Sequence, residues 1–91
     1  MTMWNHDVDV TRPINGGIQH EFKFPNGYGA SVVRHDFSYG HEAGLWEAAV
    51  LGVGGHLTYL TPITDDVVGH LDDVGVEKFL DAVAALPEIP A

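Results

Sequence analysis

Six histidines and 13 acidic residues are the side chains in this sequence that could bind a metal or catalyse proton transfer. Their closest grouping is His35-Asp36 with His41-Glu42, at the two sides of one short segment. Two imidazoles and a carboxylate are typical ligands of zinc or non-haem iron. However, the sequence has no His-x-His or His-x-x-x-His pair, so spacing alone does not bring these ligands together. A metal-dependent enzyme using the His35–Glu42 loop is therefore an alternative hypothesis, and solvated or hydrogen-bonded histidines are the simpler interpretation.

The other chemical motifs have structural explanations. The pairs Asp65-Asp66 and Asp72-Asp73 do not form the Asp-x-[Asp/Asn]-x-[Asp/Asn]-Gly pattern of a calcium loop, and helix capping accounts for them. Neither serine lies in a nucleophile elbow, and no phosphate-binding loop is present. We therefore expect a protein without enzymatic activity, cofactor or bound metal.

Charge and composition restrict the class of partner. The formal net charge is −9, with six acids and three bases in residues 1–60 and seven acids and one base in residues 61–91. Such a chain repels nucleic acid and anionic lipid and favours a partner with a basic surface. The absence of cysteine excludes disulfides. We also expect no signal peptide and no membrane-spanning segment, because no long apolar run is present.

The middle of the chain has the pattern of an antiparallel sheet. Residues 18–24 alternate between apolar and polar positions, and residues 28–35 and 45–51 follow as two further strands. The bend at Pro25-Asn26-Gly27 and the glycines at 52–55 predict hairpin turns, with residues 56–60 as a fourth strand. Residues 36–44 form a glycine-bounded loop in which Phe37 and Tyr39 could cover the sheet edge.

The ends of the chain have different patterns. Residues 1–17 predict an extended N-terminal arm, with a short edge strand interrupted by Arg12-Pro13 and the glycines that follow. After the sheet, Thr64 or Asp65 would cap a short helix through Leu71, and Asp72 or Asp73 would cap a second helix to Leu86. The predicted fold is therefore α+β: a four-stranded antiparallel β-meander packed against two C-terminal α-helices, with residues 18–91 as a single domain.

Several short motifs resemble a group of small proteins encoded by bacteriophages and prophages. They read FPNGYGASVV at 24–33, GLWE at 44–47, LTY at 57–59 and TPITDDVVG at 61–69. The resemblance covers about residues 20–87 and implies expression in the cytoplasm of a host bacterium. It transfers no catalytic residue, because the family has no defined activity.

These observations favour a protein-binding module that modulates a host or phage protein. Acidic and aromatic side chains would contact the partner, as aromatic anchors dominate many interfaces. The candidate residues are Asp65, Asp66, Asp72, Asp73, Asp81, Tyr39, Trp46 and Trp4. A virion-associated or self-assembling structural protein is a further alternative, and a homodimer would be a natural way for so short a chain to bury more apolar surface.

Overall fold

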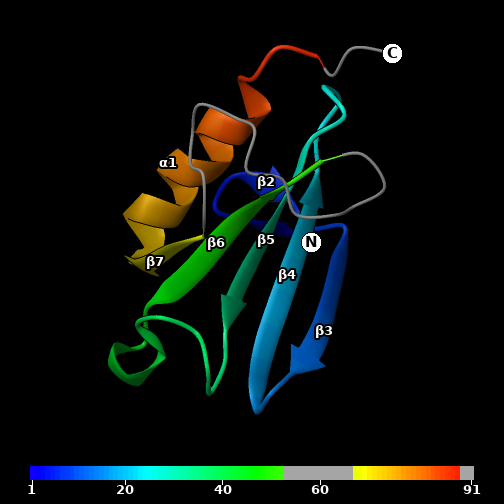
Figure 1. Ribbon diagram of the computed structural model, residues 1–91. Coiled ribbons are helices and arrows are strands. Elements are labelled where there is room, and N and C mark those ends of the chain that lie inside the picture. Colours follow the sequence, from blue (N-terminus) through cyan, green and yellow to red (C-terminus); the bar gives the residue numbers. More distant parts are fainter. Residues whose placement is uncertain (53–66, 89–91) are drawn as a thin grey trace.

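The computed structural model describes residues 1–52 and 67–88, which form an antiparallel sheet, a small hairpin and a helix (Figure 1). The elements in chain order are β1 (Thr2–Met3), β2 (His6–Asp7), β3 (Val10–Ile14), β4 (Gly17–Lys23), β5 (Gly29–Arg34), the 3-10 helix η1 (His41–Ala43), β6 (Trp46–Leu51), β7 (Val68–Leu71) and α1 (Asp73–Ala84). The α+β class, the antiparallel sheet and the C-terminal helix are as predicted.

Strands β3 to β7 form a five-stranded sheet in which each strand pairs antiparallel with the next strand in the sequence of described elements. The predicted strands over 18–24, 28–35 and 45–51 correspond to β4, β5 and β6. The predicted fourth strand at 56–60 lies outside the described residues. The two outer strands of the sheet, β3 and β7, come instead from segments that we expected to be an arm and a helix.

The N-terminal segment is more structured than predicted. Strands β1 and β2 pair across a turn at Trp4-Asn5, and β3 continues through Arg12 and Pro13 to pair with β4. Proline is tolerated there because β3 is at the edge of the sheet, where a missing N–H need not remove a ladder hydrogen bond. The turn at Asn15-Gly16 has positive φ at both residues, as a two-residue type I′ hairpin requires.

The predicted helix ending at Leu71 is wrong over its last four residues, which form β7. Leu71 pairs with Trp46 and Val68 pairs with Ala48, with an irregular register between the two pairs. Pairing with an already buried strand outweighs the local capping signals that suggested a helix, and a β-branched residue followed by glycine is a poor helix former. The described part of the chain therefore contains one α-helix, α1.

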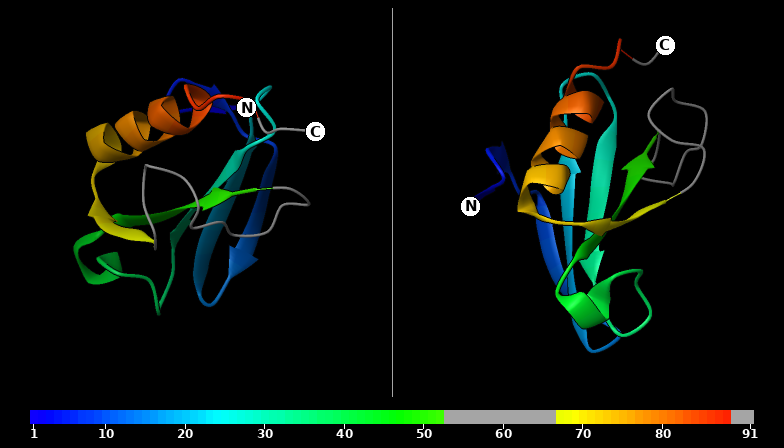
Figure 2. Two further views of the ribbon diagram at one scale, coloured as in Figure 1. Left: turned by 45° about the horizontal axis from the view of Figure 1, so that its top comes forward. Right: turned by 90° about the vertical axis from the view of Figure 1, so that its left-hand side faces the viewer.

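One face of the sheet carries the core. Helix α1 and the β1–β2 hairpin lie on the same side of the sheet (Figure 2). The alternating positions of β4, β5 and β6 and the apolar stripe of α1 meet there, as the sequence periodicity predicts. The buried cluster consists of Phe22, Ala30, Val32, Trp46, Ala48, Val50, Val76, Phe79, Leu80 and Val83.

Different side chains form the hydrogen bonds that cap the two ends of α1. At the N-terminus, Asp72 is the N-cap, and its carboxylate accepts a hydrogen bond from the backbone N–H of Gly75 at 2.8 Å. At the C-terminus, Asn26 of the β4–β5 turn donates from Nδ2 to the carbonyl oxygens of Val83 (2.8 Å), Ala84 (3.3 Å) and Leu86 (3.1 Å). The β4–β5 turn thus supplies the donor that the last helical carbonyls need.

Candidate functional site

The segment between β5 and β6, residues 35–45, forms a loop closed by Ser38. This side chain is 4% exposed. Its hydroxyl donates to the carbonyl oxygen of His35 at 3.0 Å and accepts from the backbone N–H of His35 at 2.9 Å. The backbone N–H of Ser38 also donates to the same carbonyl at 3.0 Å. A buried serine with this many partners fixes the first half of the loop.

The second half of the loop is fixed at Tyr39, which lies between β6 and β7. Its backbone N–H donates to Oε2 of Glu47 at 2.7 Å, and its carbonyl accepts from the N–H of His70 at 3.3 Å. A Cβ added at Gly69 would lie 2.5 Å from the Cβ of Tyr39, so only glycine permits this approach. Gly40 then takes a positive φ of 88° to begin η1.

Two aromatic side chains project from this well-anchored loop into solvent. Phe37 is 79% exposed and Tyr39 is 62% exposed. Tyr39 partly meets the expectation that the two cover the sheet edge, because its side chain lies against Gly69 of the outer strand β7 while most of its surface stays exposed. Single exposed apolar residues are ordinary, but two aromatic residues two positions apart on a fixed loop resemble the aromatic anchors of protein interfaces. Among the predicted contact residues, Tyr39 is therefore placed as an anchor would be. Phe37 is an additional candidate that the loop composition alone could have indicated.

The two histidines of this loop have partners within the loop. Nδ1 of His35 accepts from the N–H of Phe37 at 3.1 Å, and Nδ1 of His41 lies 2.7 Å from the carbonyl oxygen of Ser38. Within residues 1–52 and 67–88, no three histidine or acidic side chains lie close enough together to hold a metal ion. A shallow cavity of about 280 Å³ is lined by residues 38–43 and His70. Its lining includes His41, Glu42 and His70, and the hypothesis of a metal-dependent enzyme using the His35–Glu42 loop stays a prediction.

The predicted contact residues of α1 make internal contacts. Asp72 caps the helix, Asp73 accepts a hydrogen bond from Nε1 of Trp4 at 3.0 Å, and Oδ1 of Asp81 lies 2.7 Å from Nε2 of His6. The three aspartates still lie at the surface, so they keep free acceptor positions toward solvent. Asp65 and Asp66 lie outside the described residues.

The two tryptophans also face inward. Trp46 is 7% exposed and belongs to the core. Trp4 is half-buried, and its ring packs edge-on against Trp46, with ring centroids 5.0 Å apart. The guanidinium of Arg34 lies 4.2 Å from the Trp46 ring centroid, on which it forms a cation–π contact. The structure therefore uses both indoles for packing instead of presenting them as exposed anchors.

His20 is a buried polar residue of β4. The alternation of apolar and polar residues in this strand predicted that it faces the core but indicated no role for it. It is 3% exposed, and its Nδ1 lies 2.8 Å from the hydroxyl of Thr11. Burial, together with the positive charge of Arg34, lowers the pKa of His20 below its usual value of 6.5. The residue is thus held as the neutral imidazole near neutral pH.

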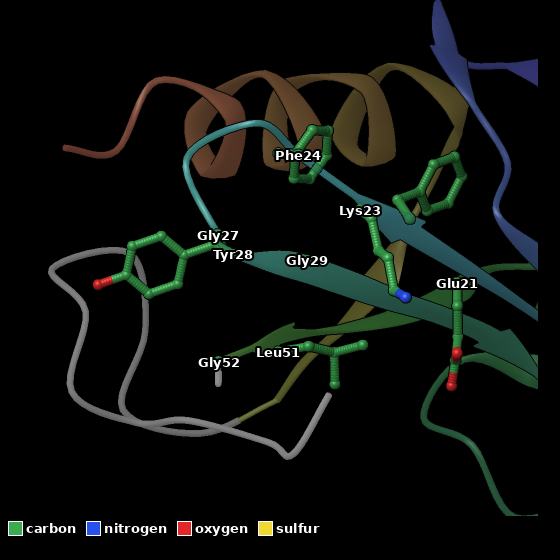
Figure 3. Close-up of a pocket in the computed structure, with 9 residues that line it drawn as sticks. Glu21, Lys23, Phe24, Gly27, Tyr28, Gly29, Leu51 and Gly52 are labelled. Carbon is green, nitrogen blue, oxygen red and sulfur yellow. The ribbon is translucent and has the colours of Figure 1, made fainter. Parts of the chain in front are cut away.

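A larger cavity of about 430 Å³ lies at the far end of the sheet, beside the β4–β5 turn (Figure 3). Glu21, Lys23, Gly29 and Leu51 line it from the face of the sheet opposite to α1. Lys23 also lies 3.7 Å from a carboxylate oxygen of Asp9. Among the described residues that line the cavity, no buried polar side chains converge as they would in a specific ligand site.

Comparison with known proteins gave no match, either to a protein family model, to a curated protein or to a solved structure. In the described residues, no helix is both long and apolar enough to cross a membrane.

Proposed function

We propose that this chain is a small acidic protein-binding module that modulates its partner without catalysis, and that Phe37 and Tyr39 are its principal contacts. The supporting observation is the exposure of both aromatic side chains on a loop whose backbone is fixed by Ser38, Glu47 and the β7 strand. A fixed loop loses little conformational entropy on binding, so more of the contact energy contributes to affinity. The resemblance to phage-encoded proteins supports a partner in the cytoplasm of a host bacterium.

Charge adds a second property of the partner. The net charge of −9 and the acidic residues along α1 favour a protein with a basic surface and would accelerate the encounter at low ionic strength. Such charges contribute to association rate and specificity more than to affinity. The aromatic contact should therefore determine how long the complex lasts, and the acidic surface should determine how fast it forms.

The test compares three forms of the chain in capture experiments from lysate of the host bacterium at low and high salt. These are the wild type, a Phe37→Ser/Tyr39→Ser double variant and Val74→Ser. Val74 is a matched control because it is also exposed, at 59%, but belongs to α1 and not to the loop. We expect wild type and Val74→Ser to retain the partner and the double variant to lose at least about tenfold in affinity, as loss of one interface anchor commonly does.

Circular dichroism of each form confirms that the fold is kept, since both substituted side chains are exposed. Equal binding by the double variant would exclude the loop as the contact site. Failure to recover any partner at low salt would count against the proposed function itself. Light scattering over a range of concentrations tests self-assembly separately, because a structural or homodimeric protein would associate without any partner.

A further inference from the structure

The β1–β2 hairpin is attached to α1 by three hydrogen-bonded side-chain pairs. Nε1 of Trp4 donates to Asp73, Nδ2 of Asn5 donates to Glu77, and Nε2 of His6 lies 2.7 Å from Oδ1 of Asp81. The three acceptors are spaced four residues apart along the helix, so they lie along one face. Consecutive residues of the hairpin turn and β2 therefore meet consecutive turns of the helix.

The hairpin depends on these contacts for its order. Each strand has only two residues, and a two-stranded hairpin of this size is at best marginally stable alone. Its turn residues, Trp4 and Asn5, have φ values of 50° and 63°. A positive φ is uncommon for a bulky residue such as tryptophan and costs conformational energy that the surrounding contacts must offset. The order of the hairpin thus depends on its contacts with α1 and with the core.

His20 lies directly beneath the hairpin. Its ring centroid is 5.8 Å from that of Trp4 and 5.8 Å from that of Trp46. Thr11 is its hydrogen-bond partner, and no other described residue is hydrogen-bonded to its second ring nitrogen, Nε2. In the protonated ring both nitrogens are donors, so Nε2 would require an acceptor or water. Trp4 is one of the two rings against the imidazole, and it belongs to the hairpin and not to the sheet, so its displacement would open this position to water.

We propose that the β1–β2 hairpin is a reversible strap over β4 and α1, and that protonation of His20 beneath Trp4 releases it. The neutral ring fits the enclosed position between the two indoles. The protonated ring would be a second cation in the cluster that already contains Arg34. Lifting Trp4 hydrates the imidazolium and relieves that repulsion.

The groups around His20 determine whether the closed hairpin favours or disfavours protonation of the ring. Thr11 of β3 is uncharged, Trp4 and Trp46 present aromatic rings, and Arg34 of β5 is the charged group that disfavours protonation. From α1, Asp73 is bonded to Trp4, so its charge is directed at the indole N–H.

The lowered pKa of His20 means that the unfolded or open chain binds a proton more readily than the closed one. The closed form is therefore fully favoured above pH 6.5, and its advantage declines as the pH falls below that value. Release of the hairpin on acidification is therefore the direction that the lowered pKa of His20 predicts.

The test uses the full chain labelled with 5-fluorotryptophan and followed by ¹⁹F NMR from about pH 7.5 to about pH 4.5, the range over which histidines titrate. The chain gives one resonance for each of its two tryptophans, and Trp4→Phe assigns them. We expect the Trp4 resonance to move toward the position of the free amino acid with a midpoint below 6.5, while the Trp46 resonance and the far-ultraviolet circular dichroism stay constant.

Two variants identify the sensor. His20→Phe keeps an aromatic ring but cannot titrate, and it should abolish the movement of the Trp4 resonance. If circular dichroism shows that this variant is unfolded, His20→Gln serves as the non-titrating variant in its place. His6→Gln removes the other histidine of the cluster and should leave the movement in place. The proposal is overturned if the non-titrating variant keeps the transition, if His6→Gln abolishes it, if Trp4 does not move over the range, or if both resonances move together with loss of secondary structure.

Discussion

Asn26 joins the β4–β5 turn to the C-terminus of α1, and its replacement should weaken the whole fold. Its Nδ2 donates to two carbonyls of the last helical turn and to that of Leu86 just beyond it, the shortest at 2.8 Å to Val83, while its Oδ1 accepts from the N–H of Tyr28 at 2.9 Å. The side chain therefore stabilises the turn and the helix end together. The Val83 and Leu86 contacts are partly buried, so water replaces the lost donor only in part.

The expected loss of stability follows from the number of hydrogen bonds that the substitution of Asn26 removes. Asn26→Ala removes two N–H donors and one acceptor, each contributing about 0.5–1.5 kcal/mol net, so we expect a loss of about 2–3 kcal/mol in the free energy of unfolding. For a chain of this size, that corresponds to a decrease of about 10–20 °C in the melting temperature. Asn26→Asp keeps an acceptor for Tyr28 but places a carboxylate against the negative end of the helix dipole. It should therefore be at least as destabilising at pH 7.

Urea unfolding followed by circular dichroism at 222 nm measures both variants. Ala84→Asp is the matched control: it adds one carboxylate at the same exposed helix end but leaves Asn26 in place. This control should lose only about 1 kcal/mol, the sum of an unfavourable dipole contact and a lower helix propensity. If Asn26→Ala and Asn26→Asp both stay within about 0.5 kcal/mol of wild type, the contacts to the helix carbonyls contribute nothing and the reasoning is wrong.

Two further substitutions test the core and the loop. Leu80→Ala, at a fully buried position of α1, should cost about 2–5 kcal/mol in urea unfolding, whereas Val74→Ala on the exposed side should stay within about 0.5 kcal/mol. Gly69→Ala places a methyl group 2.5 Å from the Cβ of Tyr39, so it should lower the free energy of unfolding by about 1–3 kcal/mol and displace Tyr39. The displacement would change the NMR shifts of the Tyr39 ring. Unchanged stability and shifts would show that β7 does not fix the loop.

The central strands were predictable because their signal is local. Alternating apolar residues in β4 and the apolar run in β6 specify a pleated strand without reference to the rest of the chain, and the stripe of α1 specifies its buried face. The sequence restricted the N-cap to Asp72 or Asp73, and the structure assigns it to Asp72.

The edges of the sheet were not predicted, for two different reasons. In β3 the signal was present: Asn15-Gly16 is a strong type I′ hairpin turn, but Pro13 suggested that the strand was interrupted. In β7 the local sequence is ambiguous, and only pairing with β6 decides the outcome. His70, with a φ of 58°, carries no side-chain signal for the irregular backbone that it adopts there.

The candidate contact residues also differ in whether nearby or distant residues determine their positions. The exposure of Phe37 and Tyr39 follows from a loop whose anchoring residues lie within a few positions of them, together with one contact to β7. The inward position of Trp4 instead depends on Asp73, 69 residues further along the chain. Together with Asn26, Trp4 fastens α1 at both ends to the first 28 residues of the chain. Because these two attachments come from separate segments and lie at opposite ends of the helix, release of the hairpin can proceed while Asn26 keeps α1 on the sheet.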